Sequence, residues 1–527
     1  MSFMEFKLTG CFHLYIIFTA IICGALVMVI EVMGSRVISP VYGVSLFVWT
    51  SLITVTLVAL SFGYAAGGII ADRGKSPDNL FIIIFAAGIA TGLVPLLKKP
   101  VLALCLPLGL RFGSLTSSAL LFFPALFLLG CVSPYIIRIA AEEMHAIGRT
   151  VGRFYALSTL GSFIGTVMTG FVLIGYFGVN RVFTLSGVTL VALSALYFAF
   201  FKRKPMALAL IAISFLVPQP GSKLAQTLSN GTTITKLLDS DSFYGNIKVV
   251  ERRNGKEAVL DLLVDNMTQG GMDIQTGESV YPYSYFASFL SHARNPDGKS
   301  CLVAGLGIGA VPMWFEGKGV STDVIDIDPE IVRTAEKYFG FRTSGRILID
   351  DARHVINGLK DKKYDFIVLD VYSGENKPSH LLSIEAMKEI RSRLSGHGIL
   401  TINLVGSIRE DTFVTASVIR TLESVFREVE VYPVFDVSKG GVWGNIIVLA
   451  YDFPAGPMNL ASLRSYRVHP KVSGLVSGTL GKRFTFPQKT PYTIITDDLN
   501  PIDLKDIGIK EKARENTLRI TGISALL

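Results

Sequence analysis

The sequence predicts an N-terminal polytopic α-helical membrane domain followed by a C-terminal α/β domain with a mostly parallel, seven-stranded sheet. Three observations predict this: long apolar stretches are confined to residues 1–218, charge is divided unequally along the chain, and strand-like and helix-like patterns alternate from residue 300 onward. Half of the 527 residues are hydrophobic and only 17% are charged. A soluble protein has about 25% charged residues, which excludes an ordinary soluble enzyme throughout.

Six apolar stretches in the first part are each about 20 residues long, enough to cross the hydrocarbon core of a bilayer. They lie near residues 11–33, 44–71, 80–97, 115–139, 154–178 and 182–201. Two shorter apolar runs, at 101–110 and 206–218, could add spans, so the sequence predicts between six and eight in total. With six spans, the basic residues around Arg73, Arg138 and Lys202 all fall on one side, which the positive-inside rule makes cytoplasmic. We therefore expect a multi-pass protein of the inner (cell) membrane, with lipid around its first part and a cytoplasmic catalytic domain.

Charge and cysteine usage exclude several classes of site. Residues 1–220 contain 14 Lys/Arg and 6 Asp/Glu, which is the whole net charge of +8, so residues 221–527 carry 36 of each sign. The basic character belongs to the membrane part, and no nucleic-acid partner is expected. The five cysteines have no paired spacing, and the histidines have no metal-ligand spacing, so neither a disulfide framework nor a metal site is expected.

The second part divides into short segments of different character. We expect a linker at residues 219–231, a small β-hairpin domain at 232–275, a catalytic domain at 276–455 and a C-terminal extension at 456–527. The hairpin joins strands at 246–251 and 258–265 through a turn at 253–255. Further strands are expected at 300–304, 321–327, 346–349, 364–370, 398–404, 428–434 and 444–451, and helices at 309–316, 329–339, 352–359, 383–394 and 411–425. Such alternation predicts a mostly parallel sheet that binds ligands at the carboxyl ends of its strands.

The first of these parallel strands ends in a glycine-rich loop. Gly305, Gly307 and Gly309 form a G-x-G-x-G pattern that closes the strand and opens a helix. Glycine lets the backbone approach a ligand closely, and a helix N-terminus offers unpaired N–H groups. The pattern lacks the third glycine of a G-x-G-x-x-G dinucleotide loop, which favours a loop for a nucleoside sulfonium of the methyltransferase type. Taken alone, the loop is explained equally well as a tight structural turn.

Acidic residues follow the next three strands of the predicted sheet. Asp326 ends the second strand, where a carboxylate can accept both hydroxyls of a ribose. Asp350 and Asp351 follow the third strand, where a side-chain acceptor can bind the amino group of adenine. Asp370 ends the fourth strand, and a carboxylate there can accept a proton or hold a cation. Asp328, just before a proline, is expected instead to cap a helix.

These features resemble the spermidine synthase (polyamine aminopropyltransferase) family over roughly residues 240–451. The resemblance rests on residues 242–249 and 263–269, on the glycine loop and the acidic strand ends, on residues 370–373 and on residues 381–387. The whole chain is similar to the membrane-fused branch of that family, in which a transporter-like domain is joined to a spermidine synthase.

The resemblance implies a Rossmann-like fold of the S-adenosylmethionine-dependent methyltransferase type. It also implies transfer of an aminopropyl group from decarboxylated S-adenosylmethionine, a co-substrate and not a bound cofactor, to an amine such as putrescine in spermidine biosynthesis. Asp370 then has the catalytic role. The donor-binding residues are Gln269, Gly305, Gly307, Gly309, Asp326, Asp350 and Asp351, and the acceptor-binding residues are Tyr281, Tyr283, Tyr372, Ser373 and Glu375. A homodimer without a metal is expected.

Two positions depart from the family pattern. Ile308 stands where the family has an acid that holds the ammonium group of the donor. Ser373 stands where the family has a second acid for the polyamine, with Glu375 nearby as a substitute. These departures keep two alternatives open: methyl or aminocarboxypropyl transfer from intact S-adenosylmethionine, and a non-catalytic ligand sensor or transport accessory.

Overall fold

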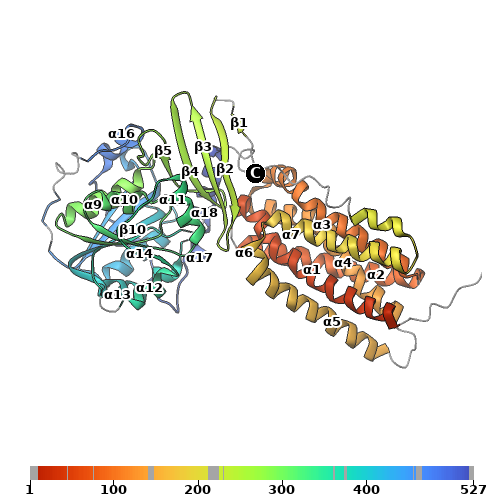
Figure 1. Cartoon of the computed structure of the whole chain (residues 1–527). Coiled ribbons are helices and arrows are strands. Elements are labelled where there is room, and N and C mark those ends of the chain that lie inside the picture. The colour runs from red at the N-terminus through yellow and green to blue at the C-terminus, as the bar shows by residue number, and fades with distance from the viewer. Residues whose placement is uncertain are drawn as a thin grey trace, which may run out of the picture. The chain divides into compact units, whose positions relative to one another are not determined.

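The computed structural model describes residues 10–43, 46–74, 76–140, 147–211, 225–228, 231–359, 362–372, 377–454, 456–458 and 466–521 (Figure 1). The backbone divides into two compact units, Met1–Ser222 and Lys223–Leu526. The first unit is helical, and the second contains all of the described strands.

The first unit is built from long apolar helices. They are α1 (Gly10–Tyr42), α2 (Leu46–Arg73), α3 (Pro77–Cys105), α4 (Gly109–Ala140), α5 (Ile147–Met168) and α7 (Val179–Phe200), with η3 (Thr169–Leu173) and α6 (Ile174–Tyr176) continuing α5. Five stretches are long and apolar enough to cross a membrane, and one of them, Pro77–Ala140, contains both α3 and α4. These helices are compatible with membrane spanning. The apolar run at 101–110 forms no helix of its own, because it is the end of α3, the turn η1 (Leu106–Leu108) and the start of α4.

Ion pairs join the ends of helices that are not consecutive along the chain in this unit. Arg138 at the end of α4 contacts Asp72 at the end of α2, with 3.2 Å between nitrogen and oxygen. Lys202, just after α7, contacts Asp78 at the start of α3 at 2.8 Å. Each pair places a helix end carrying basic residues beside another helix end, as expected for an up-and-down bundle.

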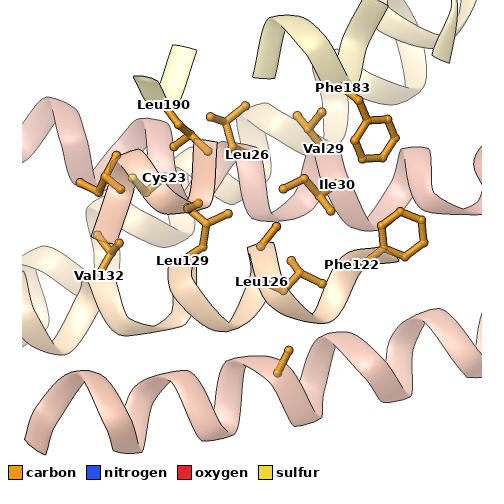
Figure 2. Close-up of a cluster of buried hydrophobic side chains, with 14 of the residues drawn as sticks. Cys23, Leu26, Val29, Ile30, Phe122, Leu126, Leu129, Val132, Phe183 and Leu190 are labelled. Atoms are coloured by element: carbon orange, nitrogen blue, oxygen red, sulfur yellow. The ribbon is translucent and has the colours of Figure 1, made fainter. Parts of the chain in front are cut away.

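Glycines let the helices pack closely. A Cβ atom added at Gly161 of α5 would lie 2.1 Å from the carbonyl oxygen of Ile21 in α1, and one added at Gly165 would lie 2.3 Å from that of Ala25. Small residues give membrane helices this close approach, which van der Waals contact then stabilises. Figure 2 shows the apolar core that results, with side chains from α1, α4 and α7, among them Leu26, Leu129 and Leu190.

The second unit begins with a five-stranded antiparallel sheet. Its strands, in spatial order, are β1 (Ala225–Thr227), β2 (Thr233–Asp241), β3 (Asn246–Asn254), β4 (Glu257–Val264) and β5 (Met267–Asp273). The predicted hairpin is β3–β4, but its turn lies later than expected. Asn254 pairs with Glu257, which leaves Gly255 and Lys256 as the loop, and Gly255 supplies the positive φ of +59° that a two-residue loop favours.

A seven-stranded sheet follows, in the order β11-β12-β10-β9-β6-β7-β8. Its strands are β6 (Ser300–Ala304), β7 (Ser321–Asp326), β8 (Ile347–Ile349), β9 (Tyr364–Leu369), β10 (Leu394–Ser407), β11 (Glu428–Pro433) and β12 (Trp443–Tyr451). The adjacent strands β10, β9, β6, β7 and β8 are parallel to one another. Strand β12 is antiparallel to both of its neighbours, β10 and β11. The connecting helices are α10 (Ala310–Glu316), α11 (Pro329–Tyr338), α12 (Ala352–Gly358), α13 (Ile384–Ser392) and α14 (Phe413–Glu423). This is the α/β methyltransferase-like architecture that the sequence predicts.

The register of the parallel strands brings their carboxyl ends level. Ala304 at the end of β6 pairs with Ile325 of β7 and with Leu369 of β9, and Asp326 pairs with Ile349 of β8. The residues that follow these strands therefore meet at one edge of the sheet. The sheet order reverses at β6, which is the position where ligands of such folds bind.

Several elements were not predicted from the sequence. They are β1, β2 and β5, helix α9 (Pro282–Arg294), and the C-terminal helices α16 (Pro470–Thr479), α17 (Ile502–Lys505) and α18 (Ile507–Thr521). Helix α18 contacts β5 and β10, so the C-terminal extension belongs to the α/β unit.

Gly161→Ala tests the packing of α5 on α1. The added methyl group has no room beside the carbonyl of Ile21, so we expect the helices to separate locally, at a cost of about 1–3 kcal/mol. The measurement is the apparent Tm of the purified full chain in detergent. Gly152→Ala is the matched control on the same helix, because nothing lies within 4 Å of its added Cβ and alanine favours a helix. Equal Tm values for the two variants would contradict the packing.

Candidate functional site

A cavity of about 630 Å³ lies at the carboxyl ends of the parallel strands. Most of the residues predicted to form a site line it: Gln269, Tyr281, Tyr283, Gly305, Gly307, Asp326, Asp350, Asp351, Asp370 and Tyr372. Gly309 does not line the cavity. Ser373 and Glu375 lie outside the described residues. Within the described ranges, no cluster of His, Cys, Asp or Glu suited to a metal ion is found.

The glycine loop allows two strand ends to touch. Gly305 has a φ of +88°, and a Cβ atom placed on it would lie 2.1 Å from the carbonyl oxygen of Asp370. Only glycine fits this position, since both the backbone angle and the space exclude a side chain. Gly309 has a φ of +80° and lies against Phe341, so it serves the turn into α10 and not the cavity.

Asp326 is fixed between the glycine loop and the turn before α11. One of its oxygens accepts the backbone N–H of Leu306 and the other that of Asp328, each at 2.9 Å. Burial raises the pKa of Asp326 to about 6, against the effect of these two hydrogen bonds. Each carboxylate oxygen has a second lone pair, so both keep a hydrogen-bonding position for a ligand.

Asp328 has the structural role that the sequence predicts. Its side chain caps α11 by accepting the N–H of Glu330 at 2.9 Å, and it accepts a second hydrogen bond from the hydroxyl of Ser242 at 2.6 Å. These bonds tie α11 to the segment between β2 and β3.

Asp351, which the sequence predicts to bind the donor, also forms hydrogen bonds within the protein through both of its oxygens. It caps α12 by accepting the N–H of His354, and its other oxygen lies 3.0 Å from Nε2 of His380. Burial acts to raise the pKa of Asp351, but the hydrogen bonds from His354 and His380 outweigh it and the pKa is lowered. Asp350 lies beside it and accepts the N–H of Asp351 at 2.7 Å.

Asp370 follows β9 and lines the cavity. Its Oδ1 accepts a hydrogen bond of 2.7 Å from the side-chain amide of Asn403 in β10, whose own oxygen accepts one of 2.9 Å from Asn445 in β12. Burial raises the pKa of Asp370 to about 6, although the bond from Asn403 acts in the other direction. The carboxylate is therefore oriented, and it changes charge close to neutral pH.

The tyrosines of the cavity are oriented by hydrogen bonds of their hydroxyl groups to the protein. The Tyr372 hydroxyl donates to the carbonyl of Asn403 at 2.9 Å, and the Tyr283 hydroxyl donates to that of Gln269 at 3.0 Å. The Tyr281 hydroxyl contacts Asp261 at 3.1 Å. Both Tyr281 and Tyr283 line the cavity, as predicted for acceptor-binding residues.

Sequence reasoning missed several residues of the cavity. Asn403 carries a detectable signal, because a lone asparagine is unusual in an apolar strand. Lys377, Asp506 and Lys510 also line the cavity, but they come from segments more than a hundred residues apart and have no motif.

Ile308 is a packing residue. Its side chain is buried and lies against Gly270 of β5, where an added Cβ atom would be 3.1 Å from it. It does not line the cavity. At the position where the resembling family has an acid, this chain therefore has an apolar side chain, Ile308, which follows β6 and packs against β5.

Comparison with known proteins relates parts of the chain to transferases. A segment of 137 residues is 34% identical to the N-terminal histidine N-methyltransferase of Emericella nidulans, and one of 115 residues is 40% identical to the polyamine aminopropyltransferase of Vibrio vulnificus. The two matches cover 25% and 21% of this chain. They span only 24% and 38% of the lengths of the respective curated relatives. No known family profile matches the chain.

Solved structures of the same two kinds are similar to part of this chain. A probable spermidine synthase from Corynebacterium glutamicum is 17% identical with a TM-score of 0.38, over 46% of this chain and 85% of that one. Human methyltransferase-like protein 13 in complex with SAH is 22% identical with a TM-score of 0.28, over 40% of this chain and 96% of that one. The sequence matches thus show similarity of parts of this chain to a polyamine aminopropyltransferase and to a methyltransferase.

Asp370→Asn tests the environment of this carboxyl group through stability. The folded protein raises its pKa from 3.8 to about 6, so folding favours the protonated form, and stability falls as pH rises through that interval. Asparagine avoids the charge, and its oxygen can still accept the bond from Asn403. We expect the variant to be more stable than the parent by about 1–3 kcal/mol at pH 8 and equal to it near pH 4.

The measurement is the apparent Tm of the full chain at the two pH values, with Asp365→Asn on the same strand as the control. Asp365 accepts hydrogen bonds from the N–H groups of Lys299 and Ser300 and from the hydroxyl of Ser395, which lower its pKa although burial opposes them. That control is expected to lose stability at pH 8. A Tm of Asp370→Asn at or below that of the parent at pH 8 would contradict the burial argument.

Proposed function

We propose that the α/β unit is an aminopropyltransferase, which moves the aminopropyl group of decarboxylated S-adenosylmethionine to an amine. The observation that supports this most strongly is the convergence of the glycine loop, Asp326 and Asp370 on one cavity, with Asp370 buried enough to have a pKa of about 6. A cavity of about 630 Å³ also falls within the usual range of small-molecule sites, about 300–1,000 Å³.

The donor would lie along the ends of β6, β7 and β8. Gly305 and Gly307 let the backbone approach its nucleoside, and Asp326 offers one hydrogen-bonding position on each oxygen to the ribose hydroxyls. Asp350, at the end of β8, would bind the adenine, and Asp351 beside it would keep its bonds to His354 and His380. Gln269, on β5, would contact the side chain of the donor.

Asp370 would act on the acceptor amine. An alkylammonium has a pKa near 10, so the amine must lose a proton before its nitrogen can attack. The nitrogen then forms a bond to the carbon next to sulfur, the carbon–sulfur bond breaks, and its electron pair remains on sulfur as the neutral thioether methylthioadenosine. The displaced proton passes to Asp370 and from there to solvent. Asn403 would keep the carboxylate in the orientation that this step needs.

Methyl transfer from intact S-adenosylmethionine is a second candidate. It is favoured by Ile308, which leaves no carboxylate at that position of the loop, and by the similarity to a histidine N-methyltransferase. The same cavity and the same base would serve, because an amine nitrogen attacks a carbon next to sulfur in both reactions.

We propose further that the helical unit crosses the inner membrane and holds the α/β unit on the cytoplasmic side, as in the membrane-fused branch of spermidine synthases. Its long apolar helices and the basic residues at Arg73, Arg138 and Lys202 support this orientation. A polyamine as substrate and a homodimer stay predictions.

Asp370→Asn should stop transfer and leave donor binding intact. The purified full chain in detergent is supplied with decarboxylated S-adenosylmethionine and putrescine, and methylthioadenosine is measured by chromatography. Loss of the proton acceptor should reduce turnover by about 10²–10⁴-fold. Calorimetric titration with the donor should give a similar Kd for the parent and the variant, and Asp365→Asn, outside the cavity, should keep its turnover.

The other outcomes of this experiment distinguish the candidates. Persistent turnover in Asp370→Asn would show that the base is assigned wrongly. S-adenosylhomocysteine produced from the intact donor would establish methyl transfer instead. Donor binding without either product would favour a ligand sensor.

The pH profile of turnover gives an independent check. We expect kcat/KM to rise with pH through an apparent pKa of about 6, because Asp370 must be ionised to accept a proton. Asn403→Ala removes the donor that favours the ionised form, so this limb should move upward by about half to one pH unit. An unchanged limb in Asn403→Ala would assign it to another group, such as Asp326.

A further inference from the structure

One carboxylate lies near the middle of the first apolar helix of the helical unit. Glu31 is the one acidic residue of α1, which runs from Gly10 to Tyr42. It is five residues beyond the midpoint of that helix, which is about 8 Å at a rise of about 1.5 Å per residue. In the proposed membrane orientation, Glu31 therefore lies inside a hydrocarbon core that is about 30 Å thick.

The charge of Glu31 has no partner within the described ranges of the chain. Its half-buried side chain forms neither a hydrogen bond nor an ion pair with the described residues. The other two described carboxylates of this unit are both compensated, Asp72 by Arg138 and Asp78 by Lys202. A carboxylate without a partner is costly in apolar surroundings, and ionisable groups at membrane depth typically mark functional sites.

Helix geometry places Glu31 on the side of α1 that packs against α5, the helix that lies along it in Figure 1. A Cβ atom added at Gly24 would lie 2.3 Å from the carbonyl oxygen of Ser158 in α5. The hydroxyl of Ser162 donates to the carbonyl of Gly24 at 3.1 Å. Glu31 comes seven residues after Gly24, which is two helical turns, so both residues share this face.

The part of the chain beside Glu31 is a turn of π-helix. The close contacts of Ile21 with Gly161 and of Ala25 with Gly165 show that α1 and α5 run in the same direction, with a constant offset of 140 positions. The same offset from Glu31 leads into η3 (Thr169–Leu173), which is π-helical and contacts α1. Turns of π-helix are rare and frequently occur at functional sites. The uncompensated carboxylate and the π-helical turn thus share one level of this interface.

The surroundings of Glu31 suit an organic cation better than a metal ion. Calcium and magnesium ions take about six to eight oxygen ligands, and the described residues contain no cluster of His, Cys, Asp or Glu suited to a metal. An alkylammonium needs one carboxylate for its charge and apolar contacts for its carbon chain. Apolar residues adjoin Glu31 on α1 and make up much of η3, namely Val27, Met28, Val32, Phe171 and Val172.

We propose that Glu31 binds a primary alkylammonium at the interface of α1 with α5 and η3. The proposal rests on the proposed crossing of the membrane and not on the transferase activity. It adds an amine site to the helical unit, separate from the cavity at Asp370, whose lining residues all belong to the second unit. The helical unit then binds the same class of compound that the α/β unit is proposed to alkylate.

Labelling of Glu31 tests the proposal on the unaltered chain. Dicyclohexylcarbodiimide is an apolar reagent that modifies protonated carboxyl groups, and mass spectrometry of peptides identifies the modified residue. The full chain in detergent is labelled alone and with butylamine, butan-1-ol or sodium chloride at equal concentrations. We expect butylamine to slow the modification of Glu31 by at least about tenfold, because an ion pair keeps the carboxyl group ionised. The alcohol and the salt should have little effect.

Glu31→Gln removes the charge and keeps nearly the same side-chain shape. The amount of radiolabelled butylamine bound by the full chain is measured by equilibrium dialysis. We expect the variant to bind one equivalent per chain fewer than the parent. Asp72→Asn is the matched control, because Asp72 is a carboxylate of the same unit that is exposed and pairs with Arg138. The control should bind as much butylamine as the parent.

The remaining outcomes would overturn the site. They are equal protection of Glu31 by butan-1-ol or sodium, no protection by butylamine, and equal binding of butylamine by the parent and Glu31→Gln. Absence of labelling at Glu31 at any pH would place its carboxyl group outside apolar surroundings and overturn the proposal as well. Both measurements are read at Glu31, so their failure leaves the proposed transfer at Asp370 standing. Failure of that transfer likewise leaves the site at Glu31 standing.

Discussion

The close contact between the end of β6 and the end of β9 is the constraint on which the site depends. The backbone of Gly305 passes so near the carbonyl of Asp370 that no side chain fits between them. This contact sets the glycine loop and Asp370 at adjoining points of one sheet edge, and the level strand ends add Asp326 and Asp350. Because parallel strands share one direction, residues separated by twenty or more positions in the chain become neighbours.

Carboxylates of one chemical type differ in role here because their surroundings differ. Asp328 and Asp351 accept backbone N–H groups at helix starts, so their oxygens are largely used by the protein. Burial raises the pKa of Asp326 and of Asp370 to about 6, although Asp326 accepts two backbone N–H groups and Asp370 accepts the side-chain amide of Asn403. A raised pKa in a cavity is typical of groups that meet a ligand, whereas capping carboxylates stabilise the fold.

The departures from the resembling family concern charge and not architecture. Ile308 fills its position by contact with β5, and the cavity gains Lys471 and Lys510 from two C-terminal helices that the sequence did not predict. In the proposed function, the residues that would bind the nucleoside and accept the proton are kept, and the groups that would contact the acceptor differ. The packing of the helical unit depends on a different principle. Glycines have no side chain, so the backbones of neighbouring helices can come into contact.

The sequence by itself determined the long apolar helices, the strands and helices of the α/β unit and the residues at the strand ends. These follow from local periodicity, from glycine and proline positions and from the length of apolar runs. Only the tertiary structure decided that Asn403 orients Asp370 and that His380 forms a hydrogen bond with Asp351. It also decided that Lys377 pairs with Asp506, 129 positions further along the chain. No local pattern encodes such pairs, because each arises from the packing of elements that are distant in the chain, and the burial that shifts a pKa exists only after that packing forms.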